Sequence, residues 1–194
     1  MTYPQFILAS VSPKRSSLFA RFKIPYKCLP PDFNEVQDHI FPYIIPLINA
    51  EGKCRSTSRI HPDSWVISAD TVIESQGRII GKPLCPEDAE EMLLKFSGRT
   101  HRVITAIAIA RDSSKIFCSF ADHSQVSFRK LSRDDVREYI SKINPLNKAG
   151  AYSIDEYGEM IIEKVTGSKT NVAGLPIEKL TEALLSLGIQ VQLP

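Results

Sequence analysis

The chain has 194 residues, of which 24 are basic and 22 are acidic, so that its formal net charge is +2. This length suits one domain with a substantial core, and 43% hydrophobic with 24% charged residues is ordinary for a soluble globular protein. The composition excludes a disordered chain, and the small net charge argues against a general nucleic-acid coat, which needs a strong basic excess. Four cysteines and four histidines are scattered, so we expect neither a disulfide framework nor a histidine-built metal site.

The first half of the chain alternates short apolar runs with helical patterns. In chain order we expect a strand over Gln5–Ser10, a helix from Ser12-Pro13 to about Phe22, a strand over Tyr26–Leu29, a polar turn over Asp32–Gln37, a helix over about Ile44–Ser58, and strands over Trp65–Glu74 and Ile79–Ile80 joined by a turn at Gly77. The amino terminus lacks the basic start and the long apolar run of a signal peptide.

The second half continues the alternation and adds two long strands. We expect a helix over Pro86–Phe96, strands over Thr100–Ala110 and Ile116–Phe128, a helix from the capping box of Ser132 and Asp135 to about Lys142, strands over Ala151–Ile154 and Glu159–Val165, and a closing helix over Pro176–Leu187. No stretch approaches the roughly 18 unbroken apolar residues of a membrane span. We therefore expect an α/β fold with a mixed, twisted sheet and flanking helices, in a cytoplasmic protein without membrane association.

The first segment with chemical potential joins the amino-terminal strand to its helix and reads LASVSPKR over residues 8–15. A helix start offers unpaired N–H groups and partial positive charge, which suit phosphate. Ser10 and Ser12 add hydroxyl donors, while Lys14 and Arg15 add cations, and arginine can grip phosphate oxygens in a bidentate fork. The segment is a candidate phosphate-binding loop; an ordinary capped helix with solvated basic residues is the alternative.

A second candidate segment is Ser68-Ala69-Asp70-Thr71, which ends the apolar run Trp65–Ile67. A carboxylate at the end of a strand run is well placed to hold a divalent cation or to take a proton from water. A hairpin would bring Lys82 back toward Asp70, although a turn-forming aspartate and a solvated loop lysine are the plain alternatives. P-loop, dinucleotide and serine-hydrolase patterns are all missing, which removes the main signals of those sites.

Two further segments are weaker on their own. Glu35 with Lys53 downstream reads by default as an exposed acid and a helix-face lysine. A glycine-bearing stretch, 150–158, contains Asp155, and the polar loop 167–176 precedes the last helix. This loop either lines a ligand or merely connects a strand to a helix.

Taken together, the segments resemble the Maf-like family, the septum-formation-inhibitor homologues that are nucleoside triphosphate pyrophosphatases. Six motifs appear in the family's order across nearly the whole chain, and their joint occurrence is far more specific than any one of them. They are LASxSPRRxxLL at Leu8–Phe19, SADTVV at Ser68–Ile73, GKP at Gly81–Pro83, GRTHxVxT at Gly98–Thr105, GAYxIxxxG at Gly150–Gly158 and NVxGLP at Asn171–Pro176.

The resemblance implies one domain over residues 1–194, with two lobes around a cleft as in inosine-triphosphate pyrophosphatases. It implies hydrolysis of a nucleoside triphosphate to a nucleoside monophosphate and pyrophosphate, with Mg²⁺ or Mn²⁺ as the divalent cation. Family members are commonly cytoplasmic and often homodimeric. Apart from the nucleotide, neither a nucleic acid nor a membrane is an expected partner.

Matched positions carry the family's site residues onto this chain. Asp70 matches the general base, and the polar active-site set is matched by Ser10, Arg15, Glu35, Lys53 and Lys82. Glu35 and Asp70 are also the metal candidates. Triphosphate hydrolysis requires the negative charge of the phosphates to be neutralised. We expect this from the metal and from Ser10, Ser12, Arg15, Lys53 and Lys82.

Three positions bear on the nucleobase. The branch that favours thymidine and uridine triphosphates has arginine where Lys14 stands, glutamine where Asp155 stands, and threonine where Thr71 stands. Thr71 places this chain nearer that branch, but Lys14 loses the bidentate fork and an ionised Asp155 cannot donate a hydrogen bond. If residue 155 reads a base edge, recognition here should differ from that branch, and dTTP, UTP and modified nucleotides are the candidate substrates.

Two other functions are compatible with the same motifs. A non-catalytic nucleotide-binding regulator of cell division would share the phosphate-binding loop but need no base. A DNA-binding module built on Ser12–Arg15 would show steep salt dependence, and the net charge speaks against it. House-cleaning of modified nucleotides and a brake on cell division both fit the enzyme.

Overall fold

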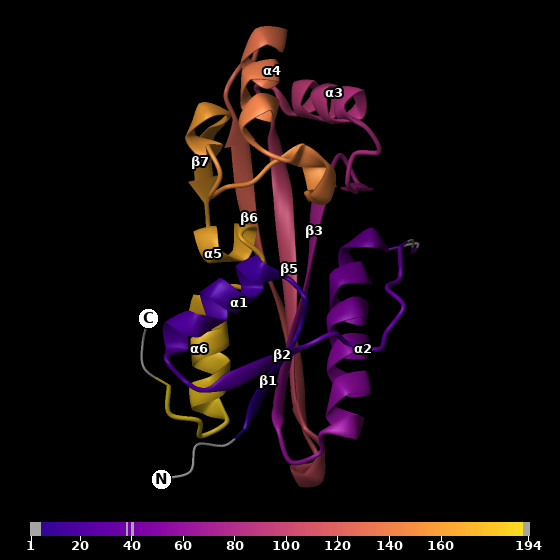
Figure 1. Ribbon diagram of the computed structural model, residues 1–194, viewed down its shortest axis with the longest axis vertical. Coiled ribbons are helices and arrows are strands. Elements are labelled where there is room, and N and C mark those ends of the chain that lie inside the picture. The colour runs from indigo at the N-terminus through magenta and orange to yellow at the C-terminus, as the bar shows by residue number, and fades with distance from the viewer. Residues whose placement is uncertain (1–4, 38, 40, 192–194) are drawn as a thin grey trace. The chain divides into compact units, whose positions relative to one another are not determined.

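The strands of the computed structural model, which describes residues 5–37, 39 and 41–191, form one mixed sheet (Figure 1). The seven strands found in these residues are β1 Phe6–Ala9, β2 Tyr26–Leu29, β3 Trp65–Ser75, β4 Arg78–Ile80, β5 Thr100–Arg111, β6 Ile116–Phe128 and β7 Ile162–Thr166. Their order is β2-β1-β3-β5-β6-β7, and β4 pairs only with β3. β1 is parallel to β2 and β3, whereas β3–β4 and β6–β7 are antiparallel, which confirms the expected mixed α/β fold.

Side chains cap the start of several helices, although α2 and α6 begin without such a cap. The α-helices are α1 Pro13–Phe19, α2 Ile45–Ile60, α3 Pro86–Phe96, α4 Arg133–Lys142, α5 Lys169–Val172 and α6 Ile177–Ser186. Ser12 caps α1 by accepting the Arg15 N–H, and Ser132 and Asp135 form the predicted capping box of α4. Within the described residues, none of these helices has the length and apolar character that crossing a bilayer requires.

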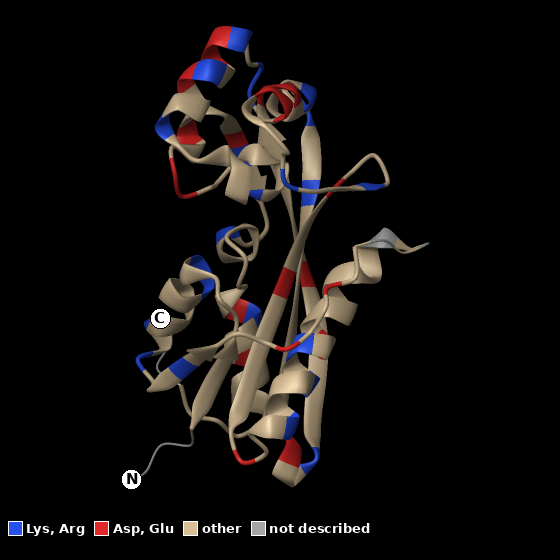
Figure 2. Cartoon of the chain, turned by 45° about the vertical axis from the view of Figure 1, so that its right-hand side comes forward, with Lys and Arg blue, Asp and Glu red and all other residues tan. Residues whose placement is uncertain are grey.

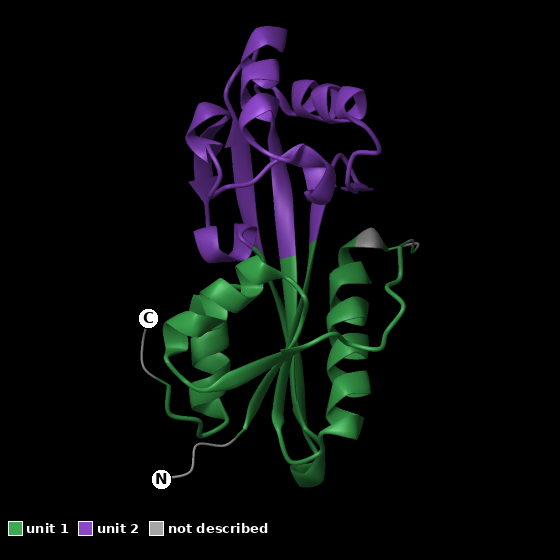
Figure 3. Cartoon of the chain, viewed as in Figure 1, with its two compact units in different colours: residues 1–71, 105–122, 174–194 green, residues 72–104, 123–173 purple. Residues whose placement is uncertain are grey.

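The chain divides into two compact units (Figure 3). Unit 1 comprises the described residues of 1–71, 105–122 and 174–194, and unit 2 comprises 72–104 and 123–173. In unit 1, α2 covers one side of β1 and β3 while α1 and α6 lie on the other (Figure 1). Its core under α2 is built largely of small side chains, including Ala50, Cys54, Ala106 and Ala108, which let the helix approach the sheet closely.

Unit 2 has a core of larger side chains. Phe96, Phe128, Tyr139 and Tyr152 are all buried there, together with Leu93. Aromatic rings contribute much buried area and prefer the tilted and edge-to-face contacts seen here, such as 5.1 Å between the centroids of Phe128 and Tyr152.

Charges of both signs mix over α3 and α4 of unit 2 (Figure 2). Glu90 of α3 accepts hydrogen bonds from Arg133 at 2.6 Å and from Arg137 at 3.1 Å, both of α4. The two arginines hold the pKa of the Glu90 carboxyl below its ordinary value. Since α3 is mainly acidic and α4 carries both signs, these helices lack the one-signed basic stripe typical of a nucleic-acid surface.

Three expectations about the carboxyl-terminal third need correction. The strand predicted over Ala151–Ile154 is wrong, because Gly150 and Ala151 adopt φ of +65° and +63° and end a 3₁₀ turn, Ala149–Ala151. The left-handed backbone cannot continue an extended strand. The strand predicted from Glu159 starts only at Ile162, after a second 3₁₀ turn, Gly158–Met160.

The third correction concerns the loop before the last helix. Residues 169–172 form the short helix α5, which Ser168 caps by accepting the Asn171 N–H.

At the other end of the chain, the first predicted helix reaches Phe22 only as a 3₁₀ turn, Ala20–Phe22, since Lys23 takes a left-handed conformation at φ 53°.

His101 is buried in the aromatic core of unit 2 and is 4% exposed. Its Nε2 lies 2.8 Å from the Tyr152 hydroxyl, and its Nδ1 is buried with no hydrogen-bond partner among the described residues. Phe96 and Phe128 pack against the ring. Burial lowers the pKa of His101 to about 4, because the cation would lose its hydration.

The free energy of unfolding is therefore expected to fall as the pH drops from 6.5 toward 4. In this window the unfolded chain protonates His101 at its ordinary pKa of 6.5 while the folded chain does not, so protons favour unfolding. The loss should reach about 3 kcal/mol by the lower end of the window. Urea denaturation across this pH range measures it.

His101→Phe removes the titrating group while keeping an aromatic ring, and should flatten the pH dependence. His123→Gln, at an exposed position, is the matched control and should retain the slope. An unchanged slope in His101→Phe would show that another group causes the acid sensitivity.

Candidate active site

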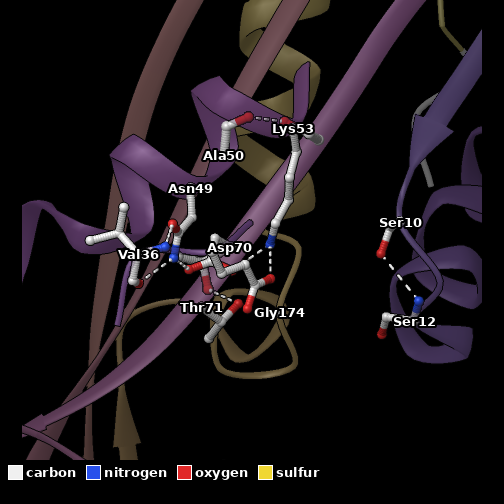
Figure 4. A network of polar contacts seen from close by, with 12 residues as sticks. Ser10, Ser12, Val36, Asn49, Ala50, Lys53, Asp70, Thr71 and Gly174 are labelled. Atoms are coloured by element: carbon white, nitrogen blue, oxygen red, sulfur yellow. Dashed lines mark hydrogen bonds and ion pairs between the residues drawn. The ribbon is translucent and has the colours of Figure 1, made fainter. Parts of the chain in front are cut away.

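Asp70 is the centre of a buried polar cluster in unit 1 (Figure 4). Lys53 of α2 donates from Nζ to Asp70 Oδ1 at 2.7 Å, and Asn49 donates from Nδ2 to Asp70 Oδ2 at 3.1 Å. Asn49 and Lys53 are four residues apart on α2 and so project from the same face of the helix. The spacing on α2 thus supplies one donor to each oxygen of the β3 carboxylate.

Glu35 joins this cluster through the same lysine. Lys53 Nζ forms an ion pair with Glu35 Oε1 as well as with Asp70 Oδ1. The lysine side chain is 6% exposed, whereas that of Glu35 is 46% exposed. A single ammonium thus bridges one buried and one half-exposed carboxylate, and the three groups together carry one negative charge.

Arg15 connects α1 to the strand that carries Asp70. Its Nε donates to the Gly174 carbonyl and its Nη2 donates to the Thr71 hydroxyl, each at 3.0 Å. Thr71 Oγ1 also lies 3.0 Å from Thr105 Oγ1. Thr71, the residue after Asp70, is thereby bonded to Arg15 of α1, the helix that begins within the candidate phosphate-binding loop.

The charge of Arg15 is subject to two opposing effects. Desolvation lowers the pKa of the guanidinium, and the charges of Asp70 and Glu35 oppose that shift. Arginine nonetheless remains protonated in proteins, so the group is a fixed cation beside the carboxylates. The two hydrogen bonds to Gly174 and Thr71 fix the orientation of the guanidinium.

The serines of the candidate loop, Ser10 and Ser12, are also in unit 1, and Figure 4 shows the hydrogen bond that joins them. The Ser12 N–H donates to Ser10 Oγ at 3.2 Å, and the Ser10 N–H donates to the Leu8 carbonyl at 2.9 Å. Ser10 is buried, while Ser12 and Lys14 are partly exposed. The loop is thereby ordered by its own hydrogen bonds.

Lys82 and Asp155, the remaining predicted site residues, belong to unit 2. Lys82 is exposed and follows β4, which forms the predicted hairpin with β3 in a register that pairs Ile73 with Ile80. Asp155 is exposed, and its N–H donates to Ser153 Oγ at 3.3 Å.

The structure therefore gathers most of the predicted site residues in unit 1. They are Ser10, Ser12, Lys14, Arg15, Glu35, Lys53, Asp70 and Thr71. The sequence reasoning did not identify Asn49, Thr105 or Gly174 as contacts of these residues. Thr105 and Gly174 lie within the motifs at Gly98–Thr105 and Asn171–Pro176, and Asn49 lies one helical turn before Lys53 on the same face of the helix.

The donor set fits a small divalent cation that takes most of its ligands from a phosphate substrate. Glu35 and Asp70 provide hard carboxylate oxygens, and the Lys53 ammonium already holds a positive charge between them. Across the described ranges, no three or more His, Cys, Asp or Glu side chains gather into a metal-holding group. Mg²⁺ suits such a site, because it binds through one or two carboxylates plus phosphate oxygens and water.

Comparison with known proteins places this chain in a family. A family model described as Maf-like protein matches residues 5–187. A dTTP/UTP pyrophosphatase of Akkermansia muciniphila is 41% identical over 186 residues, which cover 95% of this chain and 97% of that protein. A dTTP/UTP pyrophosphatase of Bacillus velezensis is 37% identical over 188 residues, with 96% and 98% covered.

A solved structure confirms the fold. The Staphylococcus aureus Ham1 protein matches with a TM-score of 0.54 at 17% identity, over 94% of this chain and 99% of that one. Identity this low supports the fold alone, while the sequence matches carry the relationship. Since the family model spans residues 5–187 and full-length relatives reach 41% identity, the chain belongs to the Maf-like family, as its six motifs predict.

Proposed function

We propose that this chain is a metal-dependent pyrophosphatase of nucleoside triphosphates, with dTTP and UTP as its first candidate substrates. The observation that carries the proposal is the buried Asp70 carboxylate, flanked by Lys53 and Asn49. The curated relatives named dTTP/UTP pyrophosphatase support it. In the reaction the bond between the α and β phosphates is broken by water, which yields the monophosphate and pyrophosphate.

Asp70 acts in this proposal as the general base that takes a proton from the attacking water. A carboxylate held by two donors points in a defined direction and can orient the water by hydrogen bonding. Lys53 balances the negative charge of Asp70 before reaction and supplies positive charge to the phosphates. Both roles follow from its position between Glu35 and Asp70.

The phosphates require cations and hydrogen-bond donors to offset their charge. In unit 1 we assign this role to Arg15, which the Thr71 hydroxyl and the Gly174 carbonyl orient, and to the serines Ser10 and Ser12. Lys14 adds a nearby charge. In unit 2 we assign Lys82 to the phosphates and Asp155 to recognition of the nucleotide.

Glu35 and Asp70 are the residues that we assign to Mg²⁺ or Mn²⁺. When bound, the cation neutralises phosphate charge and polarises phosphoryl oxygens. Glu35 is the more exposed of the two carboxylates, while Asp70 is buried and held by its donors.

Removal of divalent cations is expected to abolish turnover. Pyrophosphate release should disappear in a chelator and return on addition of Mg²⁺ or Mn²⁺. Glu35→Gln keeps the size of the side chain but removes its charge, and should raise the metal concentration for half-maximal rate by at least about 10-fold. Full activity in the chelator would contradict the metal requirement.

The substrate class is tested with a panel of triphosphates. The purified protein is incubated with dTTP, UTP, the other common triphosphates and methylated-base analogues, with Mg²⁺ or Mn²⁺. Pyrophosphate with monophosphate is the expected product pair, and orthophosphate would indicate a different cleavage. Tight nucleotide binding without turnover, unaffected by Asp70→Asn, would instead support a non-catalytic nucleotide-binding regulator.

A further inference from the structure

Asn49 makes contacts in two directions, and its contacts with Val36 are used by neither the motifs nor the proposed chemistry. Its Oδ1 accepts the Val36 N–H at 2.7 Å, and its Nδ2 donates to the Val36 carbonyl at 3.1 Å. The same Nδ2 donates to Asp70 Oδ2 at 3.1 Å. Asn49 is 3% exposed, so each of these bonds replaces contacts with water that its amide has lost.

The chemistry of the partners fixes the orientation of this amide. An ionised carboxylate only accepts hydrogen bonds, so the NH₂ group must face Asp70. The Val36 N–H only donates, so the carbonyl oxygen must face it. Asparagine is therefore the side chain of this size that satisfies both partners at once.

A second contact holds the same segment on α2. The ring of Phe33 lies against the bare backbone of Gly52, where an added Cβ would come within 2.1 Å of the ring. Phe33 and Val36 are thus both anchored on α2, and Glu35 lies between them in the chain. The segment that carries Glu35 has no regular secondary structure of its own, so these anchors determine its place.

We propose that Asn49 is a positioning residue that holds the Glu35 segment and the Asp70 carboxylate in one catalytic arrangement. The inference rests on the proposed function, in which these two carboxylates act. Asn49 and Lys53 hold Asp70 together, since they donate to different oxygens of its carboxylate. It also keeps Glu35 within reach of Lys53 by clamping the backbone of the next residue.

Two variants of Asn49 separate the halves of this role. Asn49→Asp keeps an acceptor for the Val36 N–H but loses the donor to Asp70 and places a second carboxylate beside it. Asn49→Leu, of similar size, loses both contacts. Ser68→Ala is the matched control, because Ser68 is buried at the same interface of β3 and α2 and donates to the Ala50 carbonyl at 2.5 Å.

Hydrogen exchange of the Val36 amide, followed by NMR, tests whether Asn49 holds the Val36 backbone, and it needs no assay of activity. The amide should be protected in the wild type, in Asn49→Asp and in Ser68→Ala, and should lose protection in Asn49→Leu. Protection in Asn49→Leu equal to that of the wild type would show that Asn49 does not hold the Val36 backbone.

Steady-state kinetics of pyrophosphate release test the positioning of Asp70. Both Asn49 variants should lower kcat about 10- to 100-fold, as small misplacements of catalytic groups do. KM for the nucleotide should stay within about 3-fold, because Asn49 is not assigned to the substrate. Ser68→Ala should retain the wild-type kcat.

A double-mutant cycle distinguishes positioning from stability alone. In an Asp70→Asn background, Asn49→Asp, which keeps an acceptor for the Val36 N–H, should cost little further activity, since the carboxylate that Asn49 positions is already gone. An equal cost in both backgrounds would show a merely structural role and overturn the proposal. If the wild type releases no pyrophosphate, the proposed function fails, whereas the exchange of Val36 still decides whether Asn49 holds the segment.

Discussion

Asp70→Asn is expected to lower kcat for pyrophosphate release by about 10²- to 10⁴-fold, the usual contribution of a general base. Asparagine has nearly the same shape but cannot take a proton from water. It also presents an NH₂ group where Asp70 now accepts hydrogen bonds from Lys53 and Asn49, so one of these donors loses its partner. The rate is measured as pyrophosphate release at saturating nucleotide and metal.

The loss must be attributed to chemistry rather than to unfolding. Thermal unfolding of Asp70→Asn, recorded beside the assay, should show that the variant remains folded at the assay temperature. Asp63→Asn is the matched control, because Asp63 is exposed in the same unit, shortly before β3, and should retain wild-type activity. Unchanged turnover in a folded Asp70→Asn would rule out Asp70 as the base.

Lys53→Met is expected to lower the free energy of unfolding by about 3 kcal/mol, at the lower end of the range for breaking a buried ion pair. Methionine fills similar space, but Asp70 then remains buried without its 2.7 Å partner, beside the Glu35 carboxylate that the ammonium also held. The half-exposed Glu35 can turn to water, which limits the cost. Urea denaturation measures the change.

Lys95→Met is the surface control for this variant. Lys95 pairs with Glu91 at 3.7 Å, its side chain is 73% exposed, and such pairs contribute at most about 1 kcal/mol. Mg²⁺ should recover part of the stability lost in Lys53→Met, because a cation would again lie between the carboxylates. A loss no larger than that of the control would show that the buried pair is not stabilising.

Local sequence signals predicted most of the elements around the site. Ser12 and Pro13 started α1 as expected, and the apolar run before Asp70 formed β3. They succeeded because capping and strand propensity depend on residues only a few positions apart. The segment after Gly150 was mispredicted for the complementary reason. Its left-handed turn is accompanied by a hydrogen bond from the Gly150 N–H to the distant Gly81 carbonyl, which no local pattern encodes.

The same contrast between local and long-range information applies to the candidate site. Residue types and motif order, taken from the sequence by itself, determined the family and nominated Asp70, Glu35, Lys53 and Arg15. Only the tertiary structure decided how these groups are partnered, because their contacts join residues far apart in the chain. The Arg15 side chain reaches Gly174 across 159 positions, and Asn49 acquires its role only when α2 packs against β3 and residue 36. Sequence specifies which charges are available, while packing brings carboxylates and cations within hydrogen-bonding distance of one another.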